Sequence, residues 1–474
     1  MQNKPDYQLI AVLMSGAFIA FLSNTFLNVA LPSIMDDFNV TTATVQWVTT
    51  GYMLVNGIVI PTTAFLMQRF IARQLFLTAM LLFLAGTIIA GFSPVFSILI
   101  LGRMIQAAGA AIMMPLLMNI MMTSFPPRQR GTVMGIFTLV MFFAPAIGPT
   151  LSGFVVQYYS WHYLFYMIIP IILIVLLVAY IRLPKHSDTT SINIDVLSIV
   201  LSTFAFGGIL YGFSAAGNKG WLQPDVIVAV VVGFVTLFYY VKRQLNLSIP
   251  MLDFRVYEYS MFTLASLIVG TMNMALFSGM LLMPIYLQNL RAFSPVDTGL
   301  LLLPGAIIMG LMSPISGKLF DMLGPRKLAM TGLFITTVTT FLFSRLNFES
   351  SYAHIITIYS LRAFGMSLVM TPVMTNGLNS LPNRLMPHGS AINSMLNQVS
   401  GAVGTALLIT LMQNYTHTKL QQLIGQFGRD NIDELTRQAT LSGINFSFIV
   451  ASVIILISFI LTFFLKRSGV EQQA

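Results

Sequence analysis

The sequence lacks cysteine altogether, which excludes disulfide bonds and thiol chemistry. Charge is also scarce: 8% of the 474 residues are charged, and only fifteen side chains are acidic. The five histidines are scattered, with no cysteine and no paired carboxylate to complete a metal site. The sequence contains no G-x-x-x-x-G-K-S/T segment, so nothing in it indicates an ATP-driven pump. We therefore expect no metal, no cofactor and no enzymatic active site.

The sequence is instead rich in long hydrophobic segments. Hydrophobic residues make up 56% of it, more than the core of a water-soluble protein absorbs. Apolar runs near the ~20 residues that cross a bilayer recur along the whole chain. We expect fourteen membrane-spanning helices, at 9–33, 46–67, 74–93, 95–121, 131–156, 160–182, 195–214, 223–241, 260–288, 298–316, 327–346, 351–377, 388–414 and 442–465.

Basic residues are unevenly distributed between the predicted loops. If both ends of the chain lie in the cytoplasm, sixteen of the 24 Lys and Arg residues fall on cytoplasmic loops and six on outer loops. This asymmetry follows the positive-inside rule and predicts that orientation. The net charge of +9 then reflects orientation and contact with anionic lipid, not nucleic acid. The remaining two, Arg103 and Arg362, lie inside predicted helices, whereas every acidic residue lies outside them or at their ends.

A weak internal repeat divides the chain. A short basic turn, Ala64–Arg73, follows the second predicted helix, and a turn with the same frame, Gly317–Arg326, follows the tenth. In each half a buried arginine, Arg103 or Arg362, comes next. Many membrane carriers are built from such repeats. We predict an all-α integral membrane protein with two six-helix bundles and two intervening helices, divided at 1–190, 191–250 and 251–474.

Four segments carry more specific patterns. The turn at Gly317–Arg326 reads G-x-L-x-D-x-x-G-x-R, and the fourth predicted helix places its arginine within Leu99–Gly109. The first predicted helix contains a polar motif at Leu22–Pro32. The fifth carries small residues and a proline at spaced positions, namely Gly135, Ala144, Gly148, Pro149, Ser152 and Gly153.

These motifs resemble those of the fourteen-helix drug:H⁺ antiporter family of the major facilitator superfamily, and most closely the lincomycin-resistance-type multidrug exporters of Gram-positive bacteria. The resemblance covers essentially the whole chain. It implies a multi-pass exporter in the bacterial cytoplasmic membrane, driven by proton antiport. Two departures concern the family's acids: Ser23 stands where the first-helix motif usually has Asp, and Gln68 and Ile71 replace the acid and the glycine of the first turn motif. We therefore expect neither a preference for cationic drugs nor a simple carboxylate proton relay.

The buried arginines are the first candidates for a functional site. A charge facing lipid costs about 2.5–3.5 kcal/mol on insertion scales, so Arg103 should face the bundle interior or a watery cavity. Asn24 and Asn28 of the first helix can lie at a similar depth, which predicts a cluster with Arg103 and Gln106 that senses substrate or proton. The alternative is an arginine that amides and carbonyls satisfy and that only holds helices together. Further candidates for the cavity are Tyr52, Asn56, Asn273, Arg362, Asn376, Gln398, Met114 and Met370.

Two motifs suggest moving parts. Glycine lets helices approach closely and proline removes a helical hydrogen bond, so the fifth helix could kink or simply pack tightly. The resemblance implies a hinge at Gly135, Gly148, Pro149 and Gly153. The second motif is the turn with Gly317, Asp321, Gly324 and Arg326. The Asp321 carboxylate could accept hydrogen bonds from the amides that open the next helix, or pair with Arg326, and so form a cytoplasmic gate. Alternatively, the turn could simply be solvated. Asp36 and Asp37 could collect protons or cations at the outer mouth, but we expect a solvated loop there. At 418–427 we expect a short amphipathic helix on the outer membrane surface.

The sequence thus predicts a monomeric exporter of neutral, zwitterionic or anionic amphipathic compounds. Its partners would be small-molecule drugs or metabolites, protons and membrane lipid, with no nucleic acid. One alternative is a dedicated exporter of an endogenous anionic metabolite, such as a nucleotide or lipid precursor. Another is a membrane sensor or channel, which the two-bundle repeat and the absence of a signalling domain disfavour.

Overall fold

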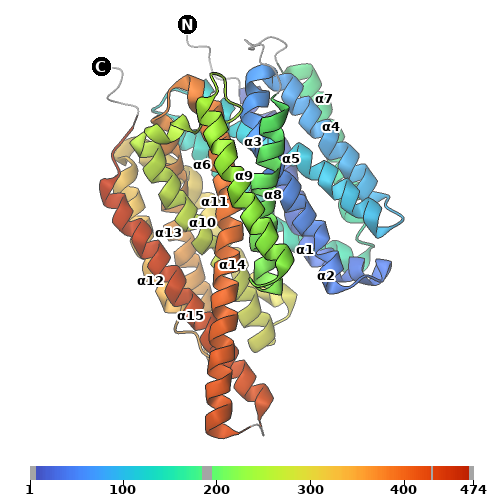
Figure 1. Cartoon of the computed structure of the whole chain (residues 1–474), viewed down its shortest axis with the longest axis vertical. Helices are drawn as coiled ribbons and strands as arrows, with labels where there is room; N and C mark the ends of the chain where they lie inside the picture. The colour runs from blue at the N-terminus through green and yellow to red at the C-terminus, as the bar shows by residue number, and fades with distance from the viewer. Residues whose placement is uncertain (1–6, 184–194, 429–430, 469–474) are drawn as a thin grey trace.

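The structure, a computed structural model, describes residues 7–183, 195–428 and 431–468, and all regular elements within these ranges are helices. Long helices run between two ends of the molecule and form two bundles (Figure 1). A helix satisfies all of its backbone hydrogen bonds internally, which is the requirement that lipid imposes on an apolar segment. The local sequence therefore accounts for the helical class of the whole chain.

The first bundle contains six long helices and one short turn of helix. Proline lies inside several of them, at positions such as Pro61 and Pro115, without ending the helix. The elements are α1 (Tyr7–Phe38), α2 (Thr42–Val45), α3 (Trp47–Arg69), α4 (Ala72–Gly91), α5 (Phe96–Ser124), α6 (Arg130–Tyr158) and α7 (Tyr163–Arg182).

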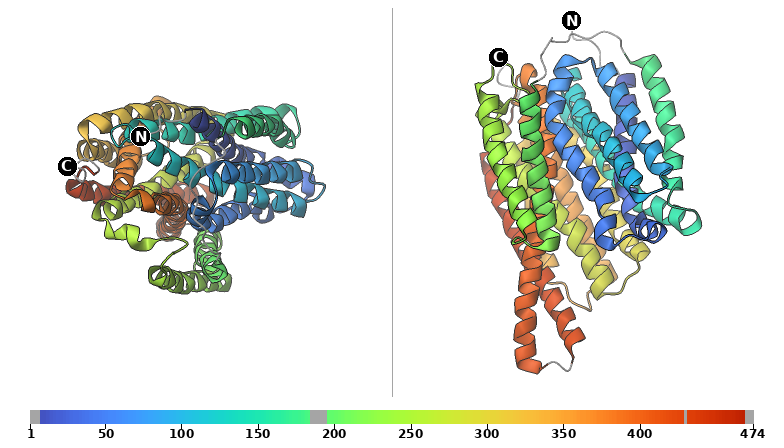
Figure 2. Two further views of the ribbon diagram at one scale, coloured as in Figure 1. Left: turned by 90° about the horizontal axis from the view of Figure 1, so that it is seen from above. Right: turned by 45° about the vertical axis from the view of Figure 1, so that its right-hand side comes forward.

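An antiparallel helix pair, α8 (Val196–Lys219) and α9 (Pro224–Asn246), follows the first bundle. It lies at one side of the molecule rather than within either bundle (Figure 2). Asp195 begins α8 by accepting a hydrogen bond from the Ser198 amide, at 3.2 Å, and Pro224 begins α9.

The second bundle has the same number of long helices as the first. Gly324 separates α11 from α12 and adopts a φ of +79°, a left-handed conformation that glycine reaches without strain. The elements are η1 (Phe254–Glu258), α10 (Ser260–Pro284), η2 (Ile285–Leu290), α11 (Pro295–Leu323), α12 (Pro325–Phe343), α13 (Tyr352–Asn379), η3 (Asn383–Leu385), α14 (Met386–Phe427), α15 (Ile432–Leu461) and η4 (Thr462–Phe464).

The two ends of the molecule differ. One end carries the basic turns, among them Arg69–Arg73 and Lys318–Lys327, and we call it the basic end. At the other, the hairpin end, α14 and α15 project together beyond the remaining helices (Figure 1). Leu423, Leu435 and Ala439 form a small hydrophobic core within this projection.

Twelve helices in the described part of the chain are long and apolar enough to cross a membrane. The prediction of a helical membrane protein is therefore confirmed, and the count of fourteen is not. The two predicted spans outside this set, 131–156 and 327–346, coincide with α6 and α12. Both are helical, with 29 residues in α6 and 19 in α12.

Three predicted boundaries were wrong at the hairpin end. The segment 418–427 is the last part of α14, not a separate helix on the membrane surface, and α15 begins at Ile432 rather than at 442. Asp36 and Asp37 lie in the last turns of α1 instead of a loop, and Asp37 accepts a hydrogen bond from the Trp161 indole at 3.0 Å. The helices α14 and α15 continue through polar residues because their packing against each other stabilises the helical turns beyond the apolar stretch.

Candidate functional site

A pocket of about 300 Å³ lies towards the hairpin end, between the two bundles. Helices of both bundles contribute to its wall, α1 and α3 from the first and α10 and α14 from the second, and α8 completes it. None of the eighteen described residues that line it is ionisable. Its polar lining residues are Gln46, Thr49, Thr50, Ser214, Gln398 and Thr405.

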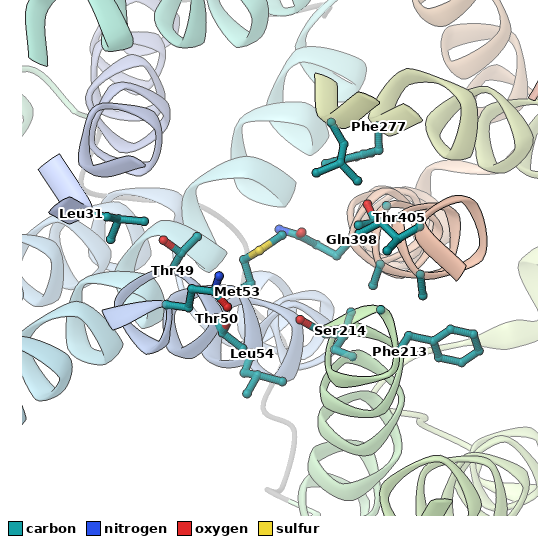
Figure 3. A pocket seen from close by; sticks show the side chains of 18 residues that line it. Leu31, Thr49, Thr50, Met53, Leu54, Phe213, Ser214, Phe277, Gln398 and Thr405 are labelled. Carbon is teal, nitrogen blue, oxygen red and sulfur yellow. The ribbon is translucent and has the colours of Figure 1, made fainter. Parts of the chain in front are cut away.

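The close view shows how these side chains face one another (Figure 3). Met53 of α3 and Gln398 of α14 extend towards each other from opposite walls, and the Ser214 hydroxyl points towards the same space. The Phe213 ring points away from it. A flexible thioether beside an amide and several hydroxyls suits a ligand that is mostly apolar and makes a few hydrogen bonds.

Arg103 forms a buried polar cluster in the first bundle. Its side chain is 1% exposed and donates hydrogen bonds to the Gln106 amide oxygen and, at 3.5 Å, to the Ser23 hydroxyl. Gln106 in turn donates to Ser23 at 3.0 Å and to Thr87 at 2.8 Å. The Tyr52 ring lies 4.2 Å from the guanidinium carbon, in cation–π geometry. No ion pair in the described part of the chain includes Arg103, and the side chains that accept its hydrogen bonds, Gln106 and Ser23, are neutral.

The α3 helix joins this cluster to the pocket. Tyr52 packs on Arg103, while the next residue, Met53, lines the pocket. Arg103 itself is not among the lining residues. A shift of α3 would therefore change both the Arg103 cluster and the pocket, because adjacent residues of one helix move together.

Arg362 has a different environment in the second bundle. It is 3% exposed, and it donates to the Thr340 hydroxyl at 3.1 Å and to the Ala275 carbonyl at 2.5 Å. These partners belong to α12 and α10, so the guanidinium of an α13 residue connects three helices. The groups that accept its hydrogen bonds are a neutral hydroxyl and a backbone carbonyl.

The other predicted cavity residues are dispersed. Of the twelve, Gln398 alone is among the described residues that line the pocket. Asn273 donates to the Asn397 side chain at 2.5 Å, and Asn376 lies at the basic end, where it bonds the backbone of Lys466 and Ser468. The amide oxygen of Asn24 is buried without a hydrogen-bond partner. Met114 and Met370 pack in hydrophobic core clusters, Asn56 is half-buried, and the Asn28 side chain lies outside the described residues.

The predicted hinge residues of α6 differ in how closely other helices approach them. A Cβ on Gly135 would lie 2.5 Å from the Ser313 carbonyl oxygen of α11, and one on Gly148 would lie 2.3 Å from the Thr25 hydroxyl of α1. Gly153 has nothing within 4 Å of that position, and the Pro149 side chain lies outside the described residues. Gly135 and Gly148 therefore let α6 approach one helix of each bundle.

The carboxylate of Asp321 connects the two bundles at the basic end. It accepts hydrogen bonds from the amides of Gly131 and Thr132, at 3.0 and 2.9 Å, and from the Thr132 hydroxyl at 2.7 Å. Both amides belong to the first turn of α6, where backbone donors lack helical partners and a negative charge is favoured. The sequence predicted partners for Asp321 in the helix that follows its own turn, or Arg326, and the structure shows different ones. The donors come from the opposite bundle, and no ion pair joins Asp321 to the exposed Arg326 in the described part of the chain.

Further hydrogen bonds between the bundles lie in the same half of the molecule. Arg130 donates to Asn379 at 3.0 Å, and Thr371 donates to Thr138 at 3.0 Å. The Gln68 amide nitrogen lies 2.9 Å from Nε2 of His388. Gly317 and Gly131 also meet closely, since a Cβ on Gly317 would lie 2.0 Å from the Gly131 carbonyl oxygen. The basic end is thus closed by these contacts between the two bundles.

Sequence reasoning missed most of the residues that line the pocket, and it missed the contact between Gln68 and His388 at the basic end. Gln46, Thr49, Thr50 and Met53 recur at spacings of three and four, a signal that could have identified one face of α3. Ser214 sits in an apolar run without such a signal. His388 was grouped with scattered histidines, because only the fold brings it to Gln68.

The chain matches a model of the Major Facilitator Superfamily over residues 13–405. It is 49% identical to an uncharacterised MFS-type transporter, YhcA, of Bacillus subtilis, over 89% of this chain and 79% of that protein. It is 41% identical to the lincomycin resistance protein LmrB of Bacillus subtilis, over 98% of this chain and 96% of that protein. The crystal structure of a human organic anion transporter shares the fold, with a TM-score of 0.68, 12% identity and coverage of 97% of this chain and 100% of that one.

These similarities confirm the family inferred from the motifs. The chain belongs to the major facilitator superfamily and is a multi-pass cell-membrane transporter, not an enzyme. Its relatives include proteins named for resistance to lincomycin and to multiple drugs.

Proposed function

We propose that this member of the major facilitator superfamily exports amphipathic small molecules by alternating access. Residues 1–190 and 251–474 would act as two rocking lobes within one monomer, with 191–250 as an intervening pair. The observation that carries the proposal is a pocket at the hairpin end lined from both halves, combined with hydrogen bonds that close the basic end. A carrier in one of its two end states has this arrangement.

We further propose that the basic end and both termini face the cytoplasm, so that the pocket belongs to an outward-facing state. The distribution of Lys and Arg supports this orientation. We also propose that α6 and α12 span the membrane, which brings the total to fourteen. The α12 helix has 19 residues and would be about 28 Å long, close to the ~30 Å of the hydrocarbon core.

The cargo we propose comprises neutral, zwitterionic or anionic drugs rather than permanent cations. The relatives named for lincomycin resistance support drugs as cargo. The pocket offers no carboxylate among its described lining residues to pair with a fixed positive charge, and an unpaired buried charge is costly. The basic residues inside the bundles, Arg103 and Arg362, would also repel cations.

Export of lincomycin and of a phenicol by this chain, compared with export of ethidium, tests the cargo. The measurement is efflux in a bacterial host that lacks its own exporters, with an empty vector as control. We expect efflux of lincomycin and the phenicol and little of ethidium. Strong ethidium efflux with no effect on the other two would refute the proposal.

We propose proton antiport as the driving force, as the family resemblance implies. Each elementary charge that crosses the membrane is worth about 2.3 kcal/mol per 100 mV. The Arg103 cluster would link ligand and proton through Tyr52 and Met53, the neighbours on α3. Lincomycin added to the purified protein in weak buffer should release protons, and Arg103→Ala should abolish the release. Drug binding with no proton release from the unmodified protein would contradict the coupling.

A further inference from the structure

The helix α8 lies where a wall of the pocket is needed. Leu210, Ser214 and Gly217 of α8 line the pocket on the side between α3 and α14. These positions are three and four residues apart, so they share one face of the helix. The α8–α9 pair stands outside the two bundles (Figure 2). Without α8, this side of the pocket would lack the surface that those residues supply.

On the first bundle, α8 is fitted closely to α3. A Cβ on Gly57 would lie 2.0 Å from the Leu210 side chain, so the absence of a side chain at Gly57 makes room for Leu210. The Trp47 and Tyr211 rings stack with their centroids 6.1 Å apart. These contacts place the same turns of α8 that line the pocket.

On the second bundle, α8 and the turn that follows it contact α14. A Cβ on Gly217 would lie 3.6 Å from the Ala406 Cα, which is ordinary packing distance. The Trp221 indole donates to the Thr410 hydroxyl at 2.7 Å. The pocket-lining part of α8 is therefore attached to both bundles.

A polar cluster fixes the other end of α8. Arg243 of α9 donates to both carboxylate oxygens of Asp195, at 3.1 and 3.0 Å. Burial would raise the pKa of Asp195, but hydrogen bonds from Ser198 and Arg243 outweigh it and lower that pKa. Gln244 donates to Ser198 at 2.6 Å and accepts from the Met251 amide at 2.7 Å, which ties the end of α9 to the start of α8 and to the segment that follows α9. Side-chain hydrogen bonds thus fix α8 and α9 relative to each other at this end.

The outer face of the pair is of a different kind from the pocket face. Val228, Val235 and Phe238 of α9 are exposed and apolar, as residues that face lipid are. Ser214 instead points into the pocket, opposite Gln398 (Figure 3). A hydroxyl and an amide across an apolar space without ionisable groups select for uncharged hydrogen-bonding molecules.

We propose that α8 is part of the ligand site, and that Ser214 and Gln398 together bind an uncharged amphipathic molecule. This proposal rests on the proposed function and names a determinant of specificity for the same pocket. The inserted helix pair then takes part in ligand recognition instead of serving only as a connection between the bundles.

Because the chain has no native cysteine, a single introduced thiol tests the proposal. Ser214→Cys is compared with Phe204→Cys. Phe204 lies on the same helix, and its side chain is 56% exposed at the molecular surface. The probe is a charged, membrane-impermeant methanethiosulfonate, applied to the full chain in proteoliposomes. We expect Ser214→Cys to react at least tenfold faster than Phe204→Cys. Chloramphenicol, which is uncharged, should slow that reaction, and ethidium should not.

A second pair of variants tests the hydroxyl. Ser214→Leu should raise the KM for chloramphenicol transport at least fivefold, and Phe204→Leu should leave it unchanged. Ser214→Thr, which keeps the hydroxyl, should lie close to the unmodified chain.

A thiol at Ser214 that reacts no faster than one at Phe204, or that chloramphenicol does not protect, would overturn the proposal. Absence of drug transport by the unmodified chain would instead overturn the proposed function. The labelling result decides the role of α8 in that case too, because it does not require transport.

Discussion

The two bundles close the basic end with different chemistry at equivalent positions of the repeat. In the second bundle, the Asp321 carboxylate accepts three hydrogen bonds from the first turn of α6. In the first bundle, Gln68 occupies the matching position and contacts His388 in the first turns of α14. A carboxylate at a helix N-terminus gains from the helix dipole and from charged hydrogen bonds, whereas a neutral amide does not. The repeat thus preserves the place of the contact but not its strength.

Backbone packing follows the same asymmetry. In the second bundle, glycine meets glycine, since Gly317 and Gly131 would clash if either carried a Cβ. In the first, Ala64 stands at the position matching Gly317, and a Cβ on Gly389 would meet side-chain ends rather than backbone, chiefly those of Leu381 and Leu378 at 2.4 and 3.1 Å. The contact made by α11 and α6 is therefore the less tolerant of the two.

The largest expected effect comes from the buried arginines, which extend the comparison to the interior. Arg103→Ala should reduce drug efflux to background while the amount of folded protein stays normal, because Arg103 connects to the pocket through α3. Arg362→Ala should instead reduce the amount of folded protein, because Arg362 holds three helices together. Efflux assays combined with detergent gel filtration measure both. Normal drug resistance with Arg103→Ala would defeat this assignment.

The next effect concerns the stronger latch. Asp321→Ala removes a charged acceptor of three hydrogen bonds, each worth about 1.5–3 kcal/mol at most. A loss of about 3 kcal/mol would shift the balance between closed and open basic ends roughly 100-fold. Distances between spin labels on introduced cysteines across the basic end measure that balance. Asp321→Asn should give an intermediate value; a distribution unchanged in both variants would contradict the latch.

Substitution of the crossing glycines should have a smaller but definite effect. Gly317→Ala places a methyl group against the Gly131 backbone and should lower efflux at least tenfold. Ala64→Gly, the matching change in the first bundle, removes a methyl group and should alter efflux less than twofold. An equal change in efflux for the two variants would show that the difference in backbone packing between the two contacts does not affect transport.

The smallest effect should come from making the weaker contact resemble the stronger. Gln68→Glu places a carboxylate beside His388 and near the start of α14. A helix N-terminus stabilises a nearby negative charge by about 0.3–1 kcal/mol, so efflux should slow a few-fold as the closed state gains stability. The same change should partly restore closure in an Asp321→Asn background. Faster efflux, or no restoration, would mean that Gln68 does not act as a latch.

Much of the candidate machinery was predictable where the signal is local. The helical class follows from apolar runs, and the burial of Arg103 and Arg362 follows from their place within such runs. Asp321 and Gly317 were identifiable because their motif is contiguous. The family followed from the same short motifs.

Partners across the fold were not predictable in this way. Asp321 was expected to bond its own neighbourhood, but its partners Gly131 and Thr132 lie about 190 positions away in the sequence. Asn376 has the composition of a cavity residue, yet it holds the backbone after α15. An amide or hydroxyl in an apolar helix does not reveal from its own sequence whether it faces a ligand, a carbonyl or another helix.

The sequence by itself determined that this chain is a helical membrane transporter, because hydrophobic length and short motifs are properties of contiguous residues. The tertiary structure decided which polar groups meet, where the pocket lies and that α8 forms part of its wall. These depend on how helices from distant parts of the chain pack, and packing is set by the shapes of both surfaces at once.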